Sequence, residues 1–99
     1  MEMKLVDRQS YGKVFISGRI DSKNSKDVQN ALMNIGDRFD NVTLNLTDLK
    51  YISSAGLRAV KNLYIKLRGK GGELVITNPA PFVLQVFEMT GFSEMLNIQ

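Results

Sequence analysis

The spacing of the hydrophobic residues changes repeatedly along this chain, and this change constrains the fold more than any other feature. In residues 42–46 the hydrophobic residues alternate with Thr43 and Asn45, and a period of two favours a β-strand. In residues 28–35 they recur at i, i+3, i+4 and i+7, which indicates an amphipathic helix. Strands and helices that alternate along one chain predict an α/β fold in which crossover helices connect mostly parallel strands.

The predicted elements follow one another in the order ββαβαβα. Strands are expected at residues 3–7, 13–20, 42–46 and 73–77, and helices from Asn24 to Gly36, from Ser53 and Ser54 to Gly69, and from Pro81 to Gly91. The turn signal at residues 10–12 predicts that the first two strands form an antiparallel hairpin at a sheet edge. The pattern predicts one α/β domain over residues 1–99, with a mostly parallel, mixed sheet of about four to five strands and helices packed on it.

Two segments are expected to be irregular. Residues 47–54 are predicted to form a loop at the carboxyl end of the third strand, where ligands and partners of such sheets usually bind. Residues 92–99 are predicted to form a short tail that packs on the body through Met95, Leu96 and Ile98.

The composition fits a globular domain and excludes several kinds of chemistry. The chain has 99 residues, of which 43% are hydrophobic and 23% charged, enough to build one core. The aromatic residues Tyr51, Tyr64, Phe82 and Phe87 are expected in that core. There is no cysteine and no histidine, so the chain alone can form no disulfide, thiolate metal site, Ser-His-Asp triad or Cys-His pair. We therefore expect no enzymatic activity and no cofactor or metal ion.

The charges indicate neither a nucleic-acid binder nor a membrane protein. The 13 basic and 10 acidic residues are scattered, and the net charge is +3. The richest basic run consists of Lys61, Lys66, Arg68 and Lys70. It falls at the end of a predicted helix, where positive charge opposes the helix dipole. No stretch approaches the roughly 20 apolar residues of a membrane span, and the N-terminus lacks a signal-peptide pattern. The sequence therefore predicts a cytoplasmic protein.

The segment from residue 45 to residue 57 carries the strongest functional signal. Ser53 and Ser54 open a predicted helix, where a serine hydroxyl can accept a hydrogen bond from an unpaired backbone N–H, worth about 1 kcal/mol. Gly56 follows within the first turn. Glycine inside a helix costs about 1 kcal/mol relative to alanine, and it suggests the close approach of another surface.

Together with motifs elsewhere, this segment resembles the STAS domain family, and among its members the stand-alone anti-sigma factor antagonists. The matching stretches are Ser17–Asp21, Leu44–Leu49, Tyr51–Leu57, Gly72–Leu74, Pro81, Val86–Phe87 and Gly91–Phe92. They cover nearly the whole chain in the family's order. The resemblance implies a regulatory protein that binds an anti-sigma factor serine kinase and thereby releases a sigma factor.

The resemblance also implies a modification site. The serine that a partner kinase phosphorylates in the family falls on Ser54, and phosphorylation there would inactivate the protein. Ser53 occupies the position where the family commonly has aspartate, which makes Ser53 a competing acceptor. Asp21 and Asp48 match other acidic positions near the family's phosphorylation site. A phosphoserine phosphatase would reset the switch.

The predicted partner-binding surface surrounds this site. It comprises Asp21, Asp48, Ser53, Ser54, Ala55, Gly56, Arg58 and Lys61. Arg58 and Lys61 are expected on the outward face of the helix, where they would steer the protein toward an acidic partner. The free protein is expected to be a monomer.

Two alternatives remain. The chain could be a STAS subunit of a transport or lipid-trafficking complex, or of another signalling assembly, that uses the same surface without phosphorylation. A small nucleotide-binding or hydrolytic protein is the other alternative. Against it, the sequence lacks a Gly-x-x-x-x-Gly-Lys-Ser/Thr loop, a metal cluster and an activated nucleophile.

Overall fold

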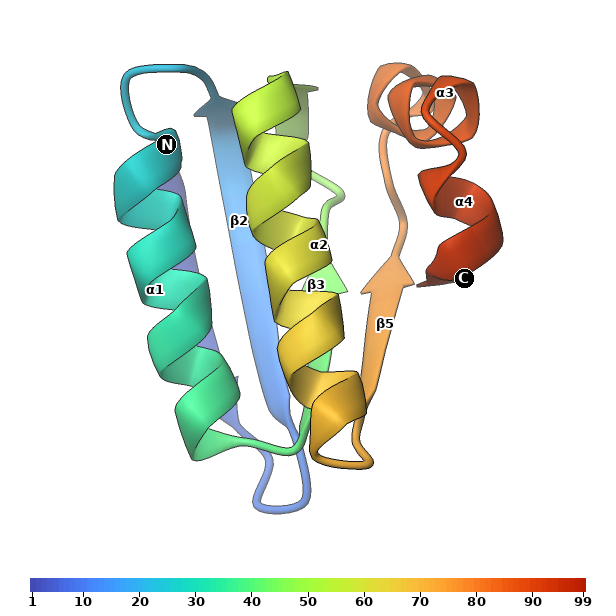
Figure 1. The fold of residues 1–99 in the computed structure, drawn as a ribbon. Helices are drawn as coiled ribbons and strands as arrows, with labels where there is room; N and C mark the ends of the chain where they lie inside the picture. Colours follow the sequence, from blue (N-terminus) through green and yellow to red (C-terminus); the bar gives the residue numbers. More distant parts are fainter.

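A computed structural model describes residues 1–99, which form one mixed β-sheet with helices packed against it (Figure 1). The elements in chain order are β1 (Glu2–Asp7), β2 (Gly12–Ile20), α1 (Ser25–Arg38), β3 (Asn41–Asn45), β4 (Leu49–Ile52), α2 (Ser54–Gly69), β5 (Glu73–Thr77), α3 (Pro81–Met89), α4 (Phe92–Met95) and β6 (Asn97–Ile98). The predicted α/β class is confirmed, with six strands and four helices.

The sheet has the strand order β1-β2-β3-β5-β6, and β4 pairs with β2 outside this path. The edge hairpin of β1 and β2 is antiparallel, as predicted, and every other pairing is parallel. Besides β1, the nine residues of β2 pair with two further strands. Its first part pairs with β3, and its last part, from Gly18 to Ile20, pairs with β4 across a register shift at Gly18 and Arg19.

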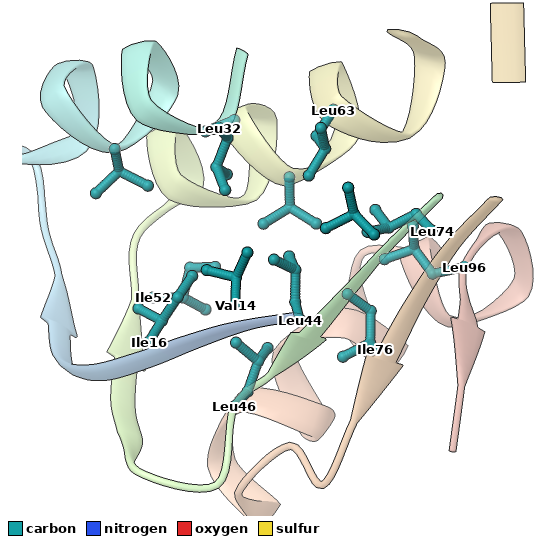
Figure 2. Close-up of a cluster of buried hydrophobic side chains, with 14 of the residues drawn as sticks. Val14, Ile16, Leu32, Leu44, Leu46, Ile52, Leu63, Leu74, Ile76 and Leu96 are labelled. Carbon is teal, nitrogen blue, oxygen red and sulfur yellow. The ribbon is translucent and has the colours of Figure 1, made fainter. Parts of the chain in front are cut away.

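The two long helices, α1 and α2, lie side by side on one face of the sheet (Figure 1). Alternate strand residues point toward them, because side chains along a strand alternate between the two faces. Figure 2 shows Val14 and Leu44 on the sheet facing Leu32 and Leu63 on the helices. These four are part of a single cluster of 22 buried residues. No helix combines the length and apolar character needed to cross a membrane.

The first helix continues past its predicted end. Gly36 lies inside α1, which ends at Arg38. The glycine is buried against α2, since a Cβ atom there would lie 3.0 Å from Cδ1 of Leu63 and 2.9 Å from Cδ of Lys66. Gly36 therefore permits close packing of the two helices and does not terminate the first one.

Both segments expected to be irregular contain regular structure. Residues 49–52, predicted as part of a loop, form β4, and Leu49 and Ile52 are buried. The tail forms α4 and the short edge strand β6. Leu96 is buried and Ile98 packs against the core, as expected, but Met95 is exposed.

Candidate functional site

The candidate site lies where β2 and β4 end side by side. Ile20 and Ile52 are paired residues at the last positions of these parallel strands, and the Ser53 N–H donates to the Ile20 carbonyl over 2.8 Å. The loop after β2 and the first turn of α2 therefore start from neighbouring points. Figure 1 places the N-terminal ends of α1 and α2, together with α3, at this same end of the molecule.

Ser53 is the N-cap of α2. Its backbone is extended, and its Oγ accepts a hydrogen bond from the Gly56 N–H over 3.1 Å. Its carbonyl accepts the first helical hydrogen bond, from the Leu57 N–H over 2.9 Å. The Ser53 hydroxyl thus satisfies one of the backbone donors that every helix start leaves unpaired.

Ser54 occupies the first helical position and is exposed. Its hydroxyl makes no hydrogen bond to another protein group. The two adjacent serines therefore differ: the hydroxyl of Ser53 is bound to the helix backbone, and the hydroxyl of Ser54 is free and faces solvent.

Gly56 belongs to the first turn of α2 and is buried on the side of that turn that faces the sheet. A Cβ atom there would lie 2.6 Å from Cγ2 of Ile20 and 2.9 Å from Cγ1 of Ile52. The close approach suggested by this glycine is therefore real, but the approaching surface belongs to β2 and β4 of the chain itself. Ala55 is half-buried, so of this turn Ser54 is the most accessible residue.

Asp21 organises the loop between β2 and α1. Its Oδ1 accepts hydrogen bonds from the backbone N–H groups of Lys23 (2.9 Å) and Asn24 (3.1 Å), while its own N–H donates to the Asn24 side chain over 3.0 Å. The hydrogen bond from Asn24 is the largest cause that lowers the pKa of the Asp21 carboxyl below its ordinary value. Partial burial opposes this shift, and the Lys23 N–H and the charges of Lys23 and Arg19 support it.

Asp48 is not brought to Ser54. It precedes β4, where its carbonyl accepts from the Gly18 N–H, whereas Ser53 follows the last residue of that strand. Five residue steps along an extended strand correspond to about 16 Å. Asp48 instead lines a cavity of about 210 Å³ beside β1, together with Glu2, Lys4 and Asn45.

Arg58 and Lys61 share a face of α2 with Ser54, because i, i+4 and i+7 fall on one side of a helix. Arg58 is exposed, as expected, and Lys61 is half-buried. Neither forms an ion pair. The outward face of the first two turns of α2 therefore carries one free hydroxyl and two unpaired positive charges.

An aromatic cluster that the sequence did not indicate lies at the ends of β2 and β4, on the face of the sheet opposite α2. The guanidinium carbon of Arg19 lies 4.4 Å from the centre of the Tyr51 ring, and the ring of Phe82 lies 6.2 Å from the Tyr51 ring. Phe87 is buried as expected, but Phe82 is 47% exposed. The expectation that Phe82 lies in the core is therefore wrong. Val83 and Phe87, four residues apart on one face of α3, are buried, and Phe82 lies off that face.

No group of three or more acidic side chains is arranged to hold a metal ion. The chemistry that the site offers is that of an exposed hydroxyl, a capped helix start and unpaired basic side chains. These groups suit binding and covalent modification of the serine.

Comparison with known proteins identifies the class. The chain belongs to the STAS domain family, whose model matches residues 2–99. BtrV of Bordetella bronchiseptica, provisionally named an anti-sigma factor antagonist, is 40% identical over 78 residues, which are 78% of this chain and 67% of that protein. The anti-sigma-B factor antagonist of Listeria monocytogenes is 28% identical over 88 residues, 87% of this chain and 76% of that protein.

Solved structures agree on the fold. The anti-sigma factor antagonist SpoIIAA in its unphosphorylated form aligns with a TM-score of 0.85 at 17% identity, covering 99% of this chain and 88% of that one. The phosphorylated form of Bacillus SpoIIAA aligns with a TM-score of 0.77 at 16% identity, covering 99% and 91%. The predicted family and fold are thus confirmed.

Proposed function

We propose that this protein is an anti-sigma factor antagonist that is switched off by phosphorylation of Ser54. In its unmodified form it binds an anti-sigma factor serine kinase through the first turns of α2 and the neighbouring Asp21 loop, and a sigma factor is released. The chain is a substrate and a binding partner, not an enzyme. ATP and Mg²⁺ belong to the kinase, and a phosphoserine phosphatase resets the switch in the cytoplasm.

The observation that carries this proposal is the difference between the two serines. A kinase needs a hydroxyl that it can reach, and the Ser54 hydroxyl is exposed and unbonded. The Ser53 Oγ accepts a hydrogen bond from the Gly56 N–H over 3.1 Å, so a kinase would have to draw this hydroxyl out of the helix turn. Ser54 is therefore the favoured acceptor even though both residues are serine.

The position of Ser54 also explains how the fold would tolerate phosphate. A phosphoserine carries about −1.5 to −2 charges at pH 7, and the positive end of a helix dipole favours such a charge. The same phosphate lies on the face of α2 that presents Arg58 and Lys61, so it reverses the charge offered to a partner. An acidic partner surface that binds the unmodified helix is then repelled.

The relatives support this reading. BtrV and the Listeria protein carry the name of anti-sigma factor antagonists, and SpoIIAA, which shares the fold, occurs in unphosphorylated and phosphorylated forms. Those names describe the relatives, and their transfer to this chain is part of the proposal.

The test is phosphate incorporation from the anti-sigma factor kinase of the same organism, mapped by mass spectrometry. Wild type and Ser53→Ala should be phosphorylated at residue 54, Ser54→Ala should take up no phosphate, and Ser54→Asp should bind the kinase more weakly than wild type. Thermal melts of all four proteins are the folding control. Phosphate on Ser54→Ala that is lost in Ser53→Ala would move the acceptor to residue 53. No incorporation into any of the proteins would favour a STAS subunit that works without phosphorylation.

A further inference from the structure

The cluster of Arg19, Tyr51 and Phe82 joins three separate elements at one exposed place. Arg19 comes from β2, Tyr51 from β4 and Phe82 from the first turn of α3. Arg19 stacks on the Tyr51 ring at 4.4 Å, and the Phe82 ring meets it at 6.2 Å with an angle of 50° between the planes. Val83 and Phe87 already anchor α3 in the core. The stability of the fold therefore does not explain why an exposed phenylalanine stands at position 82.

The cluster lies near the proposed kinase-binding surface, at the same ends of β2 and β4 but on the other face of the sheet. Ile20 and Ile52 point toward α2, so their neighbours Arg19 and Tyr51 point away from it. Tyr51 precedes Ser53 by two residues on an extended strand, which separates their Cα atoms by about 7 Å. Arg19 precedes Ile20, whose carbonyl accepts the Ser53 N–H. A standard protein interface covers about 800 Å² on each partner, so a partner that covers Ser54 can extend across the ends of these strands to the cluster.

The charges define what such a partner must present. Arg19, Lys23 and Arg58 surround the starts of α1 and α2, and none of them forms an ion pair. Two carboxylates lie among them. That of Asp21 is engaged by backbone N–H groups of its own loop, and that of Asp27 lies in the first turn of α1, close in sequence to Lys26. This end of the molecule therefore complements an acidic surface.

We infer that Arg19, Tyr51 and Phe82 form an anchor for the acidic surface of the anti-sigma factor kinase, an inference that rests on the proposed function. A carboxylate of the kinase pairs with the Arg19 guanidinium, which the Tyr51 ring holds flat so that its edge remains free for a bidentate contact. An apolar side chain of the kinase packs against the exposed face of Phe82. The few residues that contribute most of the binding free energy in protein interfaces are enriched in arginine and aromatic residues.

Two exposed hydrophobic residues on α3 allow a matched test. Phe82 is 47% exposed and contacts Tyr51, whereas Met89 is 78% exposed at the other end of the same helix. We expect Phe82→Ser and Arg19→Gln each to weaken binding of the unphosphorylated chain to the purified kinase by about tenfold or more. Met89→Ser should change it less than about twofold, and Arg19→Lys should fall between wild type and Arg19→Gln, because lysine keeps the charge but not the bidentate geometry.

Thermal melts show whether a variant binds weakly because it has lost a contact with the kinase or because it is partly unfolded. If Phe82→Ser has a lowered melting temperature, Arg19→Gln, a change at the surface, still tests the anchor. If wild type binds and Ser54→Asp weakens it, but Arg19→Gln and Phe82→Ser bind as wild type does, the anchor is wrong and the proposed function stands. Equal losses for Met89→Ser and Phe82→Ser would also overturn the anchor. A wild-type chain that does not bind the kinase overturns both.

Discussion

Basic and acidic side chains form ion pairs at one end of the α1–α2 layer, whereas the basic side chains at the other end are unpaired. Three ion pairs lie at the C-terminal end, namely Arg38–Asp7 (3.1 Å), Lys66–Asp37 (2.5 Å) and Lys70–Asp40 (3.1 Å). At the N-terminal end no ion pair forms, and the basic side chains of Arg19, Arg58 and Lys61 have no carboxylate partner. The fold forms its ion pairs at one end and leaves the basic side chains at the other end available to a partner.

The N-terminal end is nevertheless tightly built beneath its surface. Gly56 allows the first turn of α2 to rest on Ile20 and Ile52, and Ser53 and Asp21 bond to backbone groups. At this end the backbone is therefore held by close packing and hydrogen bonds, and only the outward basic side chains lack partners. Such preorganisation lowers the entropy that a partner must remove on binding.

The largest effect on stability is expected from Gly56→Ala. The new Cβ would lie 2.6 Å from Cγ2 of Ile20, and such overpacking costs about 1–3 kcal/mol, more than alanine returns in helix propensity. Gly69→Ala is the control, because nothing lies within 4 Å of its Cβ position and the change should be neutral or stabilise by up to about 1 kcal/mol. Urea unfolding compares the two. Equal stabilities would mean that α2 does not rest closely on β2 and β4.

A smaller and more diagnostic difference is expected between the two serines. Ser53→Ala removes the hydrogen bond to the Gly56 N–H and should lower the free energy of unfolding by about 1 kcal/mol. Ser54→Ala removes no hydrogen bond and should change it by less than about 0.5 kcal/mol. Thermal melts of both proteins measure the difference. The reverse ranking would mean that Ser54 provides the cap, which would remove the main support for Ser54 as the free acceptor.

The paired and unpaired ends should respond differently to loss of a lysine. Lys70 Nζ contacts the Asp40 carboxylate and the carbonyls of Gly36 (2.5 Å) and Phe39 (3.3 Å), so Lys70→Gln should cost about 1 kcal/mol of stability. Lys61→Gln should cost less than about 0.5 kcal/mol but should slow association with an acidic partner at low salt. Stopped-flow binding at two salt concentrations, alongside melts, measures both. An unchanged on-rate for Lys61→Gln would remove Lys61 from electrostatic steering.

The smallest effect concerns Asp21 and appears only with pH. Because folding lowers the pKa of this carboxyl from its ordinary value of 3.8, its stabilising contribution is present above that value and is lost as the pH falls through the lowered pKa. Asp21→Asn keeps an oxygen acceptor but cannot ionise. The stability advantage of wild type over Asp21→Asn should therefore be seen near neutral pH and should shrink as the pH falls below 3.8. An advantage that grows on acidification would contradict the assigned direction.

The sequence predicted the elements that carry a clear local signal. The helices α1 and α2 have hydrophobic residues at helical spacing, β3 has alternating ones, and β2 and β5 have short runs of β-branched and other hydrophobic residues. The strand β4 was missed because its four residues begin only a few positions after β3 and pair with β2 instead of β3. β6 has two residues, too few for any period. The end of α1 was misplaced because Gly36 serves helix packing, which only the tertiary structure reveals.

The site could be predicted in part for similar reasons. The sequence placed Ser53, Ser54 and Gly56 at the start of a helix, but it could not assign the cap, because adjacent serines differ only in their place relative to the first helical turn. It recognised the conformational cost of Gly56 but not that Ile20 and Ile52 lie against it. It grouped Asp48 with Ser54 because it did not anticipate the strand that separates them.

The central claim is that the N-terminal end of the helix layer binds the kinase and that phosphate on Ser54 prevents this. It is tested most directly by titrating the anti-sigma factor kinase with one preparation of this chain before and after phosphorylation, with the site verified by mass mapping. The account predicts that the phosphorylated chain binds at least about tenfold more weakly, because a dianion faces the acidic partner. Equal or tighter binding of the chain phosphorylated at Ser54 would contradict it.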